Sequence, residues 1–117
     1  MVTHGMKDAQ LKRFASVSSE IKTAKKPRVL EFYADWCGPC RMYGPIVEES
    51  KAKFGSQVDF KRYNVDEDES RKVAYQLGVQ GIPRTCILDR HGNIVEDHVG
   101  TMSQESLDGF VRKAISD

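Results

Sequence analysis

The sequence lacks the features by which several large classes of protein are recognised. Its formal net charge is only +1 over 117 residues, so we expect no strong electrostatic attraction to nucleic acid or to a membrane surface. No apolar run approaches the roughly 20 residues that span a bilayer. The start of the chain, Met1 to Gln10, is polar and lacks the apolar centre of a signal peptide.

Cysteine is also scarce. There are three cysteines, and an odd number is a poor framework for a fold held together by disulfides. Apolar residues make up 39% of the chain and are spread along it, which supports a folded core and argues against disorder. The length suits one domain over residues 1–117, with residues 1–6 interpreted as disordered or derived from a tag. The compartment stays open: cytoplasmic, or extracytoplasmic if a signal or an anchor was removed.

Hydrophobic periodicity predicts four helices and four strands. Apolar side chains spaced by three and four residues mark the helices, and short runs rich in aromatic and β-branched residues mark the strands. In chain order we expect helix Lys7–Lys25, strand Arg28–Ala34, helix Cys37–Phe54, strand Val58–Val65, a helix from about Asp66 to Leu77, strands Thr85–Leu88 and Ile94–Val99, and helix Ser103–Ser116.

The connections predict how the strands pair. A crossover helix joins the first two strands, which makes them parallel, and the turn at 89–93 joins the last two, which makes them antiparallel. The expected fold class is therefore α/β, with a central mixed sheet flanked by helices on both faces.

Two of the three cysteines stand close together, in Trp36-Cys37-Gly38-Pro39-Cys40, where a buried strand is followed by a helix. This pattern points to redox or metal chemistry. No metal site is expected, because His4, His91 and His98 are scattered and supply no second pair of ligands. Cys37 would lie at the helix N-terminus, where unpaired amides stabilise a thiolate, and Cys40 would lie one turn inward.

Longer stretches around this motif resemble the thioredoxin family. The run Phe32–Cys40 looks like its active-site segment, and Pro45 stands where the family has a helix-kinking proline. Asn64–Asp66 is similar to the end of the next strand, Gly81–Pro83 to the loop opposite the cysteines, and Val99–Gly100 to the last strand. The resemblance extends over about residues 28–116 and implies a thioredoxin fold.

The resemblance also implies roles for individual residues. Cys37 would attack a substrate disulfide, and Cys40 would resolve the mixed disulfide. A cis bond before Pro83 would turn the backbone of Ile82 outward, to pair with an extended substrate segment. A flat docking patch would comprise Trp36, Gly38, Pro39, Ile82, Pro83 and Gly100. The alternative for these residues is ordinary loop and core packing.

Two positions depart from the family pattern. Glu31 stands where thioredoxins usually bury an aspartate, and we expect it to move protons to and from Cys40. The alternative is a structural carboxyl paired with a lysine or an arginine. Arg84 follows Pro83, where a small polar residue is usual. Its positive charge would lie near the groove and select acidic partners or tune Cys37, or the side chain would point into solvent. Cys86 is expected to be buried and inert, with a regulatory thiol as the alternative.

The expected activity is reduction of protein disulfides by dithiol–disulfide exchange. Gly38-Pro39 between the cysteines resembles reducing members of the family, whereas histidine there would make the disulfide more oxidising. The alternatives are an oxidase or isomerase of an oxidising compartment, a binding module of the same fold, and a metal chaperone. The segments Glu31–Cys37 and Ile87–Asp89 also resemble membrane-tethered or extracytoplasmic thioredoxin-like reductases.

No organic cofactor is expected, because the dithiol itself would hold the two electrons. The partners implied by the resemblance are disulfide-containing protein substrates and an upstream reductase or a membrane electron donor. We expect a monomer, with no nucleic acid as partner.

Overall fold

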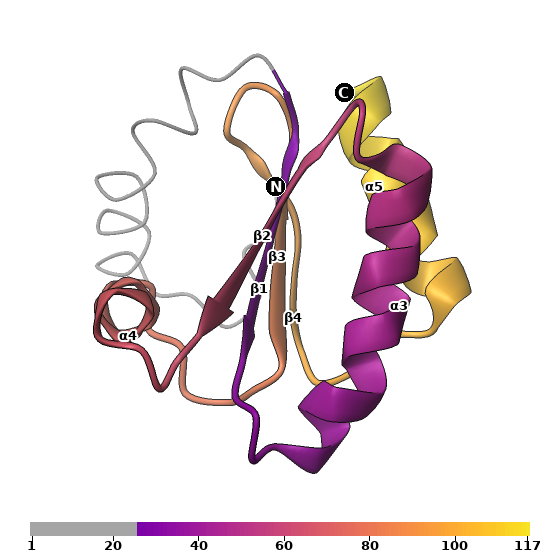
Figure 1. Cartoon of the computed structure of the whole chain (residues 1–117). Helices are drawn as coiled ribbons and strands as arrows, with labels where there is room; N and C mark the ends of the chain where they lie inside the picture. Colours follow the sequence, from indigo (N-terminus) through magenta and orange to yellow (C-terminus); the bar gives the residue numbers. More distant parts are fainter. Residues whose placement is uncertain (1–25) are drawn as a thin grey trace.

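A computed structural model describes residues 26–117 of the chain (Figure 1). The order of elements is β1 (Arg28–Tyr33), α3 (Gly38–Phe54), β2 (Asp59–Asn64), α4 (Asp68–Gln76), β3 (Arg84–Leu88), β4 (Ile94–Val99) and α5 (Gln104–Ser116). The helix expected over residues 7–25 and the disordered or tag-derived stretch expected over 1–6 lie outside the described residues. Among the helices of residues 26–117, none is long and apolar enough to cross a bilayer.

The four strands form one mixed sheet in the order β2-β1-β3-β4. β1 and β2 run parallel, and β3 is antiparallel to both β1 and β4. The helix α4 covers one face of the sheet, and α3 and α5 cover the other (Figure 1). The predicted fold class is confirmed, because the crossover through α3 and the tight turn at 89–93 impose the pairing expected from the connections.

Element boundaries differ from the sequence prediction by a few residues. β2 is shorter at both ends, and α4 begins at Asp68 rather than at Asp66. β3 begins one residue early, because Arg84 pairs with Phe32 in β1. The predicted cap of α5 is present: the Ser103 hydroxyl accepts a hydrogen bond from the backbone N–H of Ser106 at 3.1 Å.

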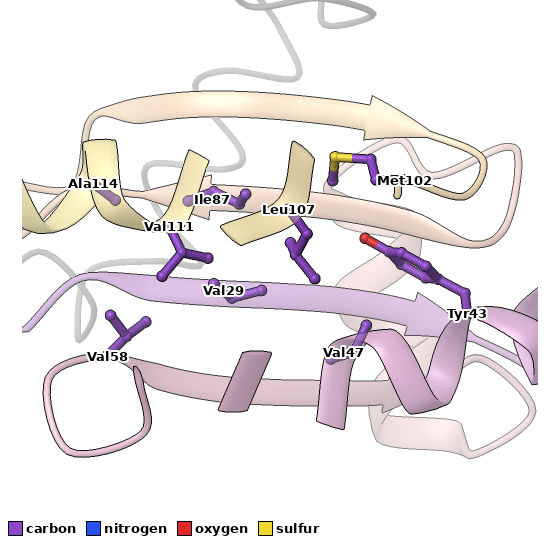
Figure 2. Close-up of a cluster of buried hydrophobic side chains, with 9 residues drawn as sticks. All are labelled: Val29, Tyr43, Val47, Val58, Ile87, Met102, Leu107, Val111 and Ala114. Carbon is purple, nitrogen blue, oxygen red and sulfur yellow. The ribbon is translucent and has the colours of Figure 1, made fainter. Parts of the chain in front are cut away.

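Two apolar cores lie on opposite faces of the sheet, because side chains alternate along each strand. Figure 2 shows the larger core, between the sheet and the helices α3 and α5. Its buried members are Val29, Tyr43, Val47, Val58, Ile87, Met102, Leu107, Val111 and Ala114. The core on the α4 face comprises Leu30, Phe32, Ala74, Leu77, Cys86, Leu88 and Ile94. Packing in the two cores holds the N-terminus of α3 and the loop before β3 at the same end of the sheet.

Candidate active site

A disulfide between Cys37 and Cys40 lies at the N-terminus of α3. Cys37 is the N-cap residue, with extended backbone at φ −86° and ψ 112°, and Pro39 lies in the first turn, where its missing N–H costs nothing. The backbone N–H of Cys40 donates to Sγ of Cys37 at 3.2 Å. This geometry stabilises negative charge on Sγ of Cys37 when the disulfide is open, because a helix N-terminus presents unpaired N–H donors.

The two sulfur-bearing residues differ in their access to solvent. Cys37 is 6% exposed and Cys40 is 1% exposed, and both pack with Ala34. Trp36 is 69% exposed beside them, and Gly38 and Pro39 are also exposed. Cys37 is therefore the sulfur that an incoming molecule can approach, as the sequence predicts.

The loop before β3 faces the disulfide. Its Ile82–Pro83 peptide bond is cis, and the carbonyl oxygen of Ile82 lies 3.9 Å from Sγ of Cys37. The backbone N–H of Gly100 donates to the carbonyl of Pro83 at 2.7 Å. Gly100 has φ +101°, a backbone conformation that residues other than glycine rarely adopt. Residues from α3, the loop and the end of β4 thus come together around Cys37.

A groove of about 350 Å³ lies between Trp36, the loop before β3 and α4. Its lining residues include Trp36, Ile82, Ala74, Tyr75 and Val79. The indole Nε1 of Trp36 donates to Oδ1 of Asp66 at 3.2 Å. The hydrogen bond to Asp66 holds the ring beside the groove, so Trp36 presents an apolar face next to Cys37.

Glu31 is fully buried beneath α3. Its Oε1 accepts from Nε of Arg62 at 2.5 Å, and among residues 26–117 its Oε2 has no hydrogen-bond partner. Burial raises the pKa of Glu31 above its ordinary value, and the ion pair with Arg62 offsets part of that effect. The ion pair matches the structural alternative for Glu31, whereas the unpartnered oxygen leaves the carboxylate able to accept a proton.

A cleft of about 400 Å³ lies between Arg62, the cation of this ion pair, and the buried Cys40. It is lined by Cys40, Arg62 and Tyr33, and the Arg62 guanidinium lies 4.2 Å from the centre of the Tyr33 ring. Sequence reasoning missed Arg62. The reason is that Arg62 meets Glu31 only through the register of the parallel strands β1 and β2, which the sequence does not fix.

The prediction that Arg84 points into solvent is wrong. The side chain is 5% exposed and forms two hydrogen bonds with the carboxylate of Asp97, at 2.8 Å from Nε and 2.6 Å from Nη2. Its Nη1 also donates to the carbonyl of Gly78 at 3.2 Å. The reason is strand alternation, because Arg84 lies on the face of β3 that packs under α4 and meets Asp97 of β4 there.

Cys86 is buried in β3, on the same face as Arg84. Burial raises the pKa of the Cys86 thiol, so this cysteine stays protonated and unreactive at neutral pH. Within residues 26–117, no three His, Cys, Asp or Glu side chains are grouped in a way that could hold a metal ion.

Comparison with known proteins gives consistent matches. The thioredoxin family model matches residues 9–113. Thioredoxin of Haemophilus influenzae is 33% identical over 101 residues, which cover 86% of this chain and 92% of that protein. Thioredoxin-like protein HCF164 of Arabidopsis thaliana is 39% identical over 82 residues, covering 70% of this chain and 31% of that protein. The structure of MTB dsbF in mixed oxidized and reduced forms matches with a TM-score of 0.68 and 26% identity, covering 78% of this chain and 82% of that one.

Proposed function

This chain belongs to the thioredoxin family and is a thiol–disulfide oxidoreductase, and we propose that it reduces protein disulfides. The observation that supports this most directly is the Cys37–Cys40 pair at the start of α3, opposite the carbonyl of Ile82. The substrates are disulfide-containing proteins. The chain works as a monomer without a bound cofactor or nucleic acid, and it receives electrons from an upstream reductase or a membrane donor.

The reaction proceeds by two exchanges. The thiolate of Cys37 attacks one sulfur of the substrate disulfide, forming a mixed disulfide and releasing the first substrate thiolate. Cys40 then loses its proton and attacks Sγ of Cys37, which forms the Cys37–Cys40 disulfide and releases the second substrate thiolate. Each released thiolate takes up one proton. Two electrons have then passed to the substrate, and the chain is left in the oxidised form.

The substrate binds by its backbone and by apolar contact. The backbone of Ile82 forms hydrogen bonds with an extended substrate segment, in the manner of an added strand. The proposed docking patch comprises Trp36, Gly38, Pro39, Ile82, Pro83 and Gly100. Its support is the carbonyl of Ile82 beside Cys37 and the hydrogen bond between Gly100 and Pro83. The groove beyond Trp36 holds an apolar side chain of the substrate.

Glu31 serves as the base for the second exchange. Its unpartnered Oε2 is free to accept the Cys40 proton, and Arg62, its ion-pair partner, lines the same cleft as Cys40. Arg62 keeps a fraction of Glu31 ionised despite burial, because it compensates the negative charge.

Replacing Glu31 by glutamine removes this base and tests its role. We expect Glu31→Gln to slow release of the mixed disulfide at neutral pH by about a hundredfold. In the parent protein, release should accelerate as the pH rises through the raised pKa of Glu31, because only the carboxylate accepts a proton. Stopped-flow measurement of release between about pH 6 and 9 checks this, since buried carboxyls and thiols titrate there.

Asp108→Asn is the matched control, because Asp108 is a buried carboxyl that pairs with Lys53 away from the cysteines. It should leave the pH dependence of release unchanged. If Glu31→Gln has the same rates as the parent across this pH range, Glu31 has only a structural role.

The direction of electron flow is tested by the reduction potential of the Cys37–Cys40 pair. A cation beside Cys37 would stabilise its thiolate and so raise the reduction potential, but Gly38 and Pro39 supply none. We therefore expect a reduction potential near or below about −270 mV. Equilibration in dithiothreitol buffers measures it, with Cys86→Ser in the background so that only one pair reacts.

An oxidase or isomerase is the second candidate, and the likeness to MTB dsbF, seen in both oxidized and reduced forms, favours testing it. A potential between about −120 and −180 mV would assign that role and would contradict the reductase proposal.

A further inference from the structure

The loop Gly78–Pro83, here called the active-site loop, holds the carbonyl of Ile82 opposite Cys37. It contains no helix or strand, yet its two ends are fixed by hydrogen bonds. At its end, the N–H of Gly100 donates to the carbonyl of Pro83 at 2.7 Å. At its start, the guanidinium of Arg84 donates to the carbonyl of Gly78 at 3.2 Å. Arg84 comes directly after the loop in the chain, and its side chain reaches back to the first residue of the loop.

Arg84 can anchor the loop only because Asp97 holds its guanidinium. Two hydrogen bonds, at 2.8 and 2.6 Å, join the planar fork of Arg84 to both oxygens of Asp97 on the neighbouring strand. A bidentate pair has one favoured geometry, so the guanidinium cannot rotate away from Gly78 while the pair is intact. A third N–H then reaches the C-terminal end of α4, where a cation is favourable.

Net stability does not explain why this pair is buried. The side chains of Arg84 and Asp97 are 5% and 1% exposed, and both were removed from water on folding. The cost of that desolvation commonly cancels the attraction between buried charges, and apolar residues of similar size serve stability as well or better. What an apolar pair cannot supply is a donor directed at Gly78.

We propose that Arg84 and Asp97 are positioning residues for disulfide exchange, which fix the active-site loop so that Ile82 meets the backbone of a peptide substrate attacked by Cys37. This inference rests on the proposed function, since it assumes that substrates pair with the loop. It predicts that loss of the pair slows attack on an extended peptide disulfide and leaves attack on a small disulfide unchanged, because a small disulfide has no backbone to pair.

Formation of the mixed disulfide tests this in the Cys40→Ser background, where Cys37 stays joined to the substrate it attacks. One probe is an extended peptide whose cysteine is joined to thionitrobenzoate, and the other is the small symmetrical disulfide dithiobis(nitrobenzoate). In both reactions Cys37 forms a bond to one sulfur, and thionitrobenzoate leaves with the electron pair and absorbs visible light. The measured quantity is the second-order rate constant for the peptide probe divided by that for dithiobis(nitrobenzoate).

The variant Arg84→Met with Asp97→Leu should keep the fold and lower this ratio by about tenfold, as expected when a reacting segment is displaced by a fraction of an ångström. The matched control is Lys53→Met with Asp108→Leu, which removes an ion pair between α3 and α5 on the other face of the sheet. The control should leave the ratio unchanged. An unchanged ratio in the Arg84/Asp97 variant, or an equal loss toward both probes, would overturn the inference.

Arg84→Lys provides the decisive measurement if the double variant does not fold. One ammonium group can neutralise Asp97, but it cannot form the bidentate pair and also reach Gly78. The ratio should fall in this variant too, and a ratio equal to that of the parent would overturn the inference. The assay does not depend on the reduction potential. Failure of Cys37 to react with either probe in the unaltered background would instead refute the proposed function, and the inference with it.

Discussion

Cys37→Ser should abolish disulfide exchange, lowering the rate by at least about a thousandfold. The hydroxyl of serine stays protonated at neutral pH and cannot form the mixed disulfide, whereas the thiolate of Cys37 is stabilised by the N–H of Cys40 at the start of α3. The measurement is turnover of a protein disulfide with dithiothreitol as electron donor. Cys40→Ser should instead allow the first exchange and stop the second, so that the mixed disulfide accumulates and is visible by mass spectrometry.

Cys86→Ser is the matched control, because Cys86 is buried away from the substrate and its pKa is raised. It should leave turnover unchanged. The result that would contradict the oxidoreductase mechanism is a Cys37→Ser, Cys40→Ser double variant that keeps full biological function. Such a result would favour a binding module that holds its partner by the surface around Ile82.

Asp97→Ala should lower the free energy of unfolding by about 3–5 kcal/mol, because it leaves the Arg84 guanidinium buried without its counter-charge. That is a large fraction of the roughly 5–15 kcal/mol by which a domain of this kind is typically stable. Urea denaturation followed by tryptophan fluorescence measures the change. The Arg84→Met, Asp97→Leu pair should be much closer to the parent in stability, because it removes both charges together.

Asp59→Ala provides the contrast at the surface. It breaks the ion pair between Arg28 and Asp59, whose N–O distance is 3.4 Å and whose side chains are 22% and 41% exposed. The expected cost is below about 1 kcal/mol, because water already screens and solvates both charges. Equal losses from Asp97→Ala and Asp59→Ala would show that burial of the Arg84–Asp97 pair has no energetic consequence and would contradict this prediction.

Local sequence was sufficient for most elements. The Ser103 cap and the spacing of apolar residues after it predict α5, and the turn at 89–93 predicts the β3–β4 pair. These signals come from residues a few positions apart, whose interactions form within one turn of helix or across one hairpin. The position of Cys37 at a helix N-terminus follows for the same reason, because a strand, a short turn and a helix-starting proline stand next to one another in the chain.

Pairings between distant residues could not be obtained in this way. Arg62 lies 31 positions from Glu31, and Asp97 lies 13 positions from Arg84. Each pair meets only when strands adopt a particular register, and a shift of one residue would turn either side chain to the opposite face of the sheet. Sequence alone therefore left two roles open for Glu31 and could not identify Asp97 as the partner of Arg84.

The sequence by itself determined the fold class, the order of the elements from β1 to α5 and the identity of the reactive pair, Cys37 and Cys40. Only the tertiary structure decided what surrounds that pair. Packing of the sheet against α4 brought the carbonyl of Ile82, 45 positions away in the chain, to 3.9 Å from Sγ of Cys37. The physical reason is that secondary structure follows from local propensity and periodicity, whereas the surroundings of a site depend on strand register and on side chains buried between layers.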